Sequence, residues 1–275
     1  EGAARLLSVI ARPDPSDATC RQDAPPDYAA ALAGAEADGA KRLRVGLPRE
    51  TFPDSLDPAM ARAVRGAADA LARAGARVVD VSLPRTDAGI PTYCLTAFPE
   101  ASSNLARYDG VHYGLRKPGA DVDALMAASR AAGFGPEVKR RILLGTFALS
   151  AGYADRYYLQ AQKVRTLILR DYEAAFRACD VILTPTTPGL PFRFGERSAD
   201  PVAMYLEDLF TVGPSLAGLP AIALPCAEVP PKRPGAGLRA AAQLVAPAWE
   251  EVRLLRAARA LEAALGRDLP RYGTG

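Results

Sequence analysis

The stretch LRVGLPRETFPDSLDPAMARAVRGAADALARAGARVVDV, residues 43–81, decides the fold of this chain. It begins with the apolar run Leu43–Leu47, which proline ends and which predicts a short strand. Asp57 followed by Pro58 is typical of a helix N-terminus, because the aspartate accepts hydrogen bonds from the first N–H groups and proline fits the first turn. We therefore expect a strand followed by a helix.

The helix predicted after Pro58 has one apolar stripe and a clear end. Apolar residues recur at helical spacing at Met60, Val64, Ala67, Ala68 and Leu71. Gly75 provides the positive φ that commonly ends a helix, and Ala76–Val81 follows at once as a second strand. A strand, a crossover helix and a strand predict two parallel strands.

The rest of the chain continues this alternation of apolar strands and amphipathic helices. The predicted elements are a helix at Ala3–Ile10, an irregular stretch at 12–17, helices across 137–178 with a break at Ser150–Gly152, strands at Asp180–Thr184, Ala221–Pro225 and Ala242–Ala246, a surface loop at Pro230–Gly235, and a helix at Glu250–Leu265. This order predicts an α/β fold with a mixed, largely parallel sheet flanked by helices.

Composition excludes several classes of protein. The 275 residues are 49% hydrophobic and 24% charged, which excludes a disordered chain or a coiled coil. The formal charge, 34 − 31 = +3, is too small to indicate a nucleic-acid-binding surface. No apolar run approaches the ~20 residues that span a bilayer, and the first residues do not resemble a signal peptide. We expect no membrane partner and a cytoplasmic location.

Cysteine and histidine offer no self-contained active site. The four cysteines are far apart, without metal-ligand spacing, and are predicted to be reduced and buried: Cys20, Cys94, Cys179 and Cys226. The only histidine, His112, lies in the loop-like stretch 109–114, where a solvated side chain is expected. The chain has no Walker A, GxGxxG or GxSxG motif, and we expect it to bind neither a metal nor a cofactor.

Five stretches of this chain match motifs of one enzyme family. LTPTTP at 183–188 and LAGLPAI at 216–222 are similar to stretches found across amidases generally. EASSNLARYDG at 100–110, EVKRRI at 137–142 and MYLED at 204–208 are more specific. Together they resemble the amidase signature family, and in particular its branch of glutamyl-tRNA(Gln) amidotransferase A subunits. The resemblance covers essentially the whole chain.

This resemblance implies an incomplete amidase signature fold. Residues 1–275 would form a single incomplete domain, equivalent to the C-terminal half of the family's domain. The family hydrolyses amides with a Ser-cisSer-Lys triad set in a glycine- and serine-rich motif of the other half, and this sequence lacks that motif. We therefore expect no catalytic residue in this chain and no activity of the chain alone.

The resemblance also implies a substrate and partners. The A subunit of the amidotransferase branch hydrolyses glutamine and supplies ammonia for converting Glu-tRNA(Gln) to Gln-tRNA(Gln), with Asp-tRNA(Asn) to Asn-tRNA(Asn) as a second conversion. It works with B and C subunits and with misacylated tRNA. ATP and magnesium are used by the partner protein of the complex, so none is expected here.

Three substrate-binding residues are implied by the same resemblance. Arg141, from EVKRRI, would bind the α-carboxylate of glutamine, and Asp208, from MYLED, would bind its α-ammonium group. Tyr93 matches an aromatic pair lining the pocket, although Cys94 stands here in place of the second tyrosine. Helical spacing favours Arg141 over Arg140 for the inner face but does not separate Arg141 from Lys139.

Other interpretations stay open at this point. By pattern alone, Lys139–Arg141 and Asp208 would be solvated surface residues, and Tyr93 a core residue. Ser102, Ser103 and Asn104 are predicted to cap and fix a loop. The function could also be that of a general amidase for small amides, or of a non-catalytic α/β interaction module that unfolds cooperatively by itself. For the isolated chain we expect aggregation instead.

Overall fold

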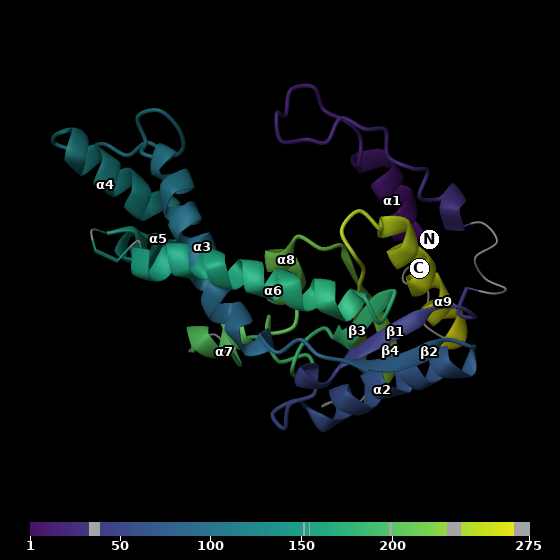
Figure 1. Ribbon diagram of the computed structural model, residues 1–275. Coiled ribbons are helices and arrows are strands. Elements are labelled where there is room, and N and C mark those ends of the chain that lie inside the picture. The colour runs from purple at the N-terminus through teal and green to yellow at the C-terminus, as the bar shows by residue number, and fades with distance from the viewer. Residues whose placement is uncertain (33–38, 151, 154, 198–199, 230–237, 267–275) are drawn as a thin grey trace. The chain divides into compact units, whose positions relative to one another are not determined.

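The computed structural model describes residues 1–32, 39–150, 152–153, 155–197, 200–229 and 238–266 (Figure 1). The chain forms two compact units, a sheet unit of Glu1–Asp87 with Ile168–Gly275 and a helical unit of Ala88–Leu167. The predicted loop Pro230–Gly235 lies outside the described residues. The prediction of one incomplete domain over 1–275 stays a prediction.

The sheet unit contains all five strands of the described residues. They are β1 (Arg44–Pro48), β2 (Arg77–Val81), β3 (Val181–Pro185), β4 (Ala221–Val229) and β5 (Leu238–Val245). Their order is β2-β1-β3-β5-β4; β1 pairs in parallel with β2 and β3, whereas β5 pairs antiparallel with β3 and β4. The predicted mixed α/β sheet is confirmed, and only β5 runs against the other strands.

Helices belong to both units of the described chain. They are α1 (Gly2–Ile10), α2 (Pro58–Arg73), α3 (Gly89–Asn104), α4 (Val122–Gly133), α5 (Pro136–Leu149), α6 (Gln160–Phe176), α7 (Pro201–Leu206), α8 (Val212–Ala217) and α9 (Glu251–Ala264). Short 3-10 turns lie at Ala30–Leu32, Arg49–Thr51, Thr86–Ala88 and Leu105–Arg107, and a π-helical turn at Asp155–Leu159. The predicted break between two helices is confirmed, because α5 ends at Leu149 with Ser150 as its C-cap.

The core of the sheet unit lies between the sheet and helices α2 and α9. The predicted stripe of α2 is buried throughout, and it joins one cluster with apolar residues of β3, β5 and α9. The five residues of β3 are all buried, as expected for a central strand covered on both faces. Gly46 of β1 leaves room for Cys179, because a Cβ there would lie 2.6 Å from the Cys179 sulfur.

The predicted ends of α2 are also confirmed. The Asp57 carboxylate accepts a 2.7 Å hydrogen bond from the Ala59 N–H, and Pro58 occupies the first turn. Gly75 has a φ of +103°, which a side chain would strain, and β2 begins two residues later. Short-range chemistry therefore sets both ends of this helix.

We expect Asp57→Ala to lower the free energy of unfolding by about 1 kcal/mol, because the first turn of α2 loses its capping acceptor. Asp57→Ser keeps a capping oxygen and should lose much less. Urea denaturation of both variants measures the difference. Equal destabilisation by alanine and serine would show that the cap is not the cause.

The cysteine prediction is half right. Cys179 and Cys226 are buried and unpaired with other cysteines, as expected. Cys20 and Cys94 are also free thiols, but they are only partly buried, so the prediction was wrong for these two. Cys20 lies in the irregular segment after α1, outside the described helices and strands.

Candidate substrate-binding site

The helical unit brings together two of the three predicted binding residues, through close packing of α3 and α5. Gly145 of α5 lies directly against the α3 backbone, since a Cβ there would be 2.1 Å from the Phe98 carbonyl oxygen. Arg141 precedes Gly145 by one helical turn and so shares the face that packs on α3. This explains why the arginine lies inward on its helix.

Arg141 is held by groups from both helices. Its Nε donates to Glu137 Oε1 at 2.8 Å, and its Nη1 donates to the Tyr93 hydroxyl at 3.2 Å. The guanidinium carbon lies 5.3 Å from the centroid of the Phe98 ring, within range of a cation–π interaction. The side chain keeps 34% of its surface exposed. We call Tyr93, Phe98, Glu137 and Arg141 the arginine cluster.

The aromatic members of the arginine cluster also pack on each other. The rings of Tyr93 and Phe98 meet edge to face, with centroids 6.0 Å apart and an interplanar angle of 76°. Phe98 is buried, whereas Tyr93 is partly exposed. This packing fixes the plane against which the guanidinium lies, so that Arg141 is oriented before any ligand arrives.

The neighbouring basic residues do not share this position. Lys139 donates from Nζ to the Ala131 carbonyl at 2.6 Å, and Arg140 is exposed and pairs with Glu137. Helical spacing could not separate Lys139 from Arg141, but the structure directs them to different contacts. Only Arg141 reaches Tyr93 among the described contacts of these three side chains.

Cys94 adjoins the arginine cluster. Burial raises the pKa of its thiol, while the nearby Arg141 guanidinium opposes the rise and the Glu137 carboxylate adds to it. The thiol is therefore protonated at neutral pH. A neutral, small side chain stands where the family resemblance leads one to expect a second tyrosine.

Two members of the arginine cluster were missed from the sequence. Glu137 precedes Arg141 by four residues, a spacing that commonly forms an ion pair on a helix and could have indicated it. Phe98 has no comparable signal, because its contact with Arg141 depends on how α3 and α5 pack. The structure alone supplies it.

Asp208 lies in the sheet unit and is described there by itself. The MYLED motif begins in α7, which spans Pro201–Leu206 and is capped by Asp200, whose carboxylate accepts from the Val202 N–H at 2.9 Å. Asp208 follows α7 and is exposed. Its binding role, like those of Arg141 and Tyr93, stays a prediction.

The prediction that Ser102, Ser103 and Asn104 cap and fix a loop was wrong. All three lie within α3, which continues past Pro99 to Asn104. The Ser102 hydroxyl is instead 2.9 Å from the Thr146 hydroxyl of α5. This contact joins the two helices that carry the arginine cluster.

His112 occupies the loop position that the sequence predicts. Its side chain is 72% exposed, and Nδ1 lies 2.7 Å from Asp109 Oδ2. The hydrogen bond from the His112 side chain, together with backbone N–H groups of His112 and Val111, lowers the pKa of the Asp109 carboxyl. The pair orders a loop turn.

The described residues contain neither a metal-ligand cluster nor a membrane-spanning helix. No three or more histidine, cysteine or acidic side chains gather there as metal ligands would. Within the same residues, every helix is too short or too polar to cross a lipid bilayer.

Comparison with known proteins identifies the family. The model of the Amidase family matches residues 1–255. The A subunit of glutamyl-tRNA(Gln) amidotransferase from Anaeromyxobacter sp. (strain K) is 51% identical over 265 residues, which are 96% of this chain and 52% of that protein. The corresponding protein of Synechococcus sp. (strain WH7803) is 52% identical over 95% of this chain and 52% of its own length.

Solved structures agree with these matches. The crystal structure of the glutamyl-tRNA(Gln) amidotransferase A subunit from Thermotoga maritima has a TM-score of 0.69 and 31% identity, covering 94% of this chain and 50% of that one. Peptide amidase from Stenotrophomonas maltophilia has a TM-score of 0.64 and 26% identity, over 94% and 50%. The chain spans about half the length of the relatives that it matches. It belongs to the amidase family.

Proposed function

We propose that this chain forms part of the glutamine-hydrolysing A subunit of a tRNA-dependent amidotransferase and supplies its glutamine-binding groups. The observation that carries the proposal is the arginine cluster, in which Arg141 is oriented by Tyr93 and Phe98. Identity of 51% to the Anaeromyxobacter A subunit, over nearly the whole of this chain, supports it.

Glutamine binding requires groups for both charged ends of the amino acid. An arginine can hold the α-carboxylate through two parallel hydrogen bonds, and an aspartate suits the α-ammonium group. We assign the first role to Arg141 and the second to Asp208. Both ends must leave water when glutamine binds, so each needs a partner of opposite charge.

The reaction proposed for the complete enzyme is hydrolysis of the glutamine side-chain amide. The bond between the amide carbon and nitrogen breaks, water supplies the hydroxyl group, and the products are glutamate and ammonia. A Ser-cisSer-Lys triad from the family's other half would perform the acyl transfer. The residues of this chain would bind and orient the substrate.

The ammonia would be used by the rest of the complex. We assign as partners the B and C subunits, misacylated Glu-tRNA(Gln) and, as a second substrate, Asp-tRNA(Asn). ATP and magnesium would act on the partner protein that activates the tRNA-linked carboxylate. A cytoplasmic location follows from this role in protein biosynthesis.

Complementation tests the proposal directly. We expect this chain, co-expressed with the N-terminal half of the Anaeromyxobacter A subunit and with the B and C subunits, to release ammonia from glutamine. Neither half alone should do so, because each lacks groups that the reaction needs. Ammonia release is measured by a coupled glutamate dehydrogenase assay. Turnover by this chain alone, or a stable assembly without turnover, would contradict the proposal.

A general amidase for small amides is the second candidate function. Its support is the similarity to peptide amidase from Stenotrophomonas maltophilia. Such an enzyme has no need to bind two charged ends, so propionamide should then serve as well as glutamine. Comparing kcat/KM for both amides in the complemented assembly distinguishes the two functions.

A further inference from the structure

A second site lies in the sheet unit, away in sequence from the arginine cluster. A pocket of about 400 Å³ opens between the start of α9 and the segment that leads into β1. Arg42, Arg253 and Arg256 line it together with Asp180, Glu250 and Leu43. Three arginine residues therefore line one pocket.

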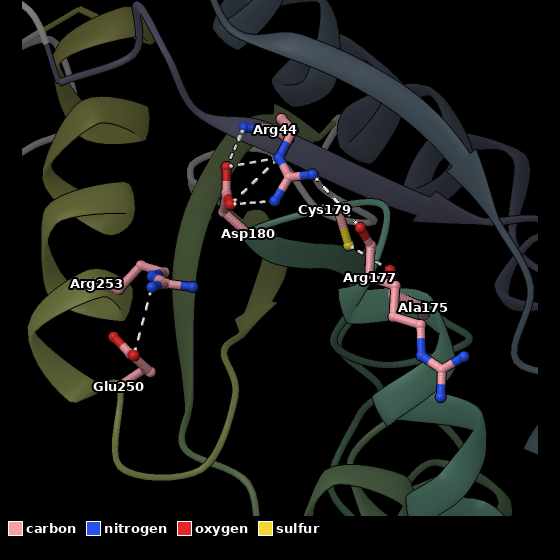
Figure 2. A network of polar contacts seen from close by, with 7 residues as sticks. All are labelled: Arg44, Ala175, Arg177, Cys179, Asp180, Glu250 and Arg253. Atoms are coloured by element: carbon pink, nitrogen blue, oxygen red, sulfur yellow. Dashed lines mark hydrogen bonds and ion pairs between the residues drawn. The ribbon is translucent and has the colours of Figure 1, made fainter.

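The acidic groups of this pocket are already paired with arginines. Asp180 accepts from Arg44 Nη2 at 2.7 Å and from the Arg44 backbone N–H at 2.8 Å (Figure 2). Burial favours the neutral acid, but these bonds outweigh it, and the pKa of Asp180 is lowered, with a contribution from Arg253. Asp180 is thus a carboxylate whose charge Arg44 balances.

The second acid, Glu250, forms an ion pair with one lining arginine, Arg253, in the described part of the chain. Its Oε1 lies 3.3 Å from Arg253 Nη2, a weak pair between groups that are each more than 40% exposed (Figure 2). The charged lining residues, Arg42, Arg253 and Arg256 against Asp180 and Glu250, have a formal charge of 3 − 2 = +1. Arg44, which does not line the pocket, balances Asp180 through its ion pair. This charge favours an anionic ligand.

Two of the arginines retain donors for a ligand. Arg256 uses Nε to bond the Ala31 carbonyl at 2.9 Å, which anchors the side chain without using its terminal nitrogens in that bond. Arg42 is exposed and has no hydrogen bond or ion pair from its side chain to any residue that the structure describes. Guanidinium donors form strong, charge-assisted hydrogen bonds with the oxygens of a phosphate group.

The first turn of α9 contributes to the positive electrostatic potential of the pocket. Val252 and Arg253 line the pocket, and Glu250, the N-cap, makes no side-chain capping bond within the described part of the chain. The N–H groups of this turn therefore lack a side-chain acceptor from the N-cap. The positive end of a helix favours an anion at this position, and the Glu251 carboxylate of the same turn offsets part of that effect.

From these observations we propose that the pocket lined by Arg42, Arg253 and Arg256 binds a phosphate group. The phosphate belongs either to a small molecule or to the backbone of a nucleic acid. Either phosphate would accept hydrogen bonds from the same arginine side chains. This site is independent of the proposed glutamine site, because it shares no residue with it.

The test measures binding of inorganic phosphate, adenosine 5′-monophosphate and a short single-stranded RNA to this chain assembled with the N-terminal half of the Anaeromyxobacter A subunit. The B and C subunits are left out, because the ATP and tRNA assigned to that part of the complex would add binding of their own. We expect the double variant Arg42→Ala/Arg253→Ala to weaken each bound probe about tenfold or more. Arg253→Lys keeps the charge but not the fork, and should weaken binding less. Isothermal titration calorimetry gives the dissociation constants.

The matched control is Arg62→Ala/Arg73→Ala, which removes the same charge from α2 outside the pocket. Stronger binding of RNA, falling steeply between about 50 and 200 mM salt, assigns the phosphate to a nucleic acid. Similar binding of all three probes assigns it to a small molecule. Equal binding by the control and pocket variants, or no binding of any probe, overturns the proposal. Ammonia release from glutamine should persist in every variant, which separates this result from the glutaminase test.

Discussion

Replacing Arg141 by alanine is expected to raise KM for glutamine about 100-fold in the complemented assembly, with kcat changed much less. The guanidinium would bind the α-carboxylate equally in the ground state and the transition state, and such uniform binding affects KM. A 100-fold change corresponds to about 2.7 kcal/mol. Removing one partner of a buried charge pair costs about 2–5 kcal/mol of binding free energy. We expect a value near the lower limit, because the Arg141 side chain is 34% exposed and solvent weakens its interactions.

Arg140→Ala is the matched control for this prediction. It removes the same side chain from the adjacent position, where the arginine is exposed and pairs only with Glu137 among its described contacts. We expect less than about a twofold change in KM, as for most exposed ion pairs. Initial rates of ammonia release over a range of glutamine concentrations give both constants. Equal effects of the two variants would contradict a role for Arg141 in binding.

The Arg141→Ala variant also distinguishes the two candidate functions. A glutamine-specific enzyme should lose activity on glutamine and keep its low activity on propionamide, which has no α-carboxylate. A general amidase should show parallel changes for both amides. The ratio of the two kcat/KM values therefore reports the contact with the charged end of the substrate.

The second large effect is expected at Gly145, where alanine should lower the free energy of unfolding by about 3 kcal/mol. The added Cβ would lie 2.1 Å from the Phe98 carbonyl oxygen and 2.5 Å from its carbon, so α3 and α5 would have to separate. Backbone atoms cannot move aside as a flexible side chain can. Separation would also pull Arg141 away from Tyr93.

Gly66→Ala is the control, and we expect it to raise the free energy of unfolding, whereas Gly145→Ala should lower it. Gly66 also lies inside a helix, α2, but a Cβ there meets nothing within 4 Å. Alanine should stabilise the protein by roughly 0.5–1 kcal/mol, because it is the better helix former. Thermal unfolding of both variants in the same assembly makes the comparison. A stabilising Gly145→Ala would show that the two helices do not pack as closely as described.

The parts of the fold that the sequence predicts are those set by short-range chemistry. Asp57, Pro58 and Gly75 define α2 and the start of β2 through capping and backbone preference, and both ends were confirmed. The apolar stripe of α2 shows which face is buried without any knowledge of its neighbours. Such signals depend on only a few adjacent residues.

The parts that could not be predicted depend on contacts between distant segments. The opposite direction of β5 has no signal in its own residues, because an apolar strand buried on both faces has the same pattern in either direction. The extension of α3 through Pro99 to Asn104 conflicts with local preference, and it is stabilised by packing against α5. That packing also supplies Phe98 to the candidate site.

The place of β5 has a consequence for how the chain assembles during synthesis. β4 is hydrogen-bonded only to β5 within the described sheet, and β5 also completes the second side of β3. A nascent chain that has emerged only as far as β4 therefore has no partner for that strand, and β3 exposes unpaired backbone groups. Pairings between such distant segments form slowly, so the sheet cannot be completed until β5 has left the ribosome.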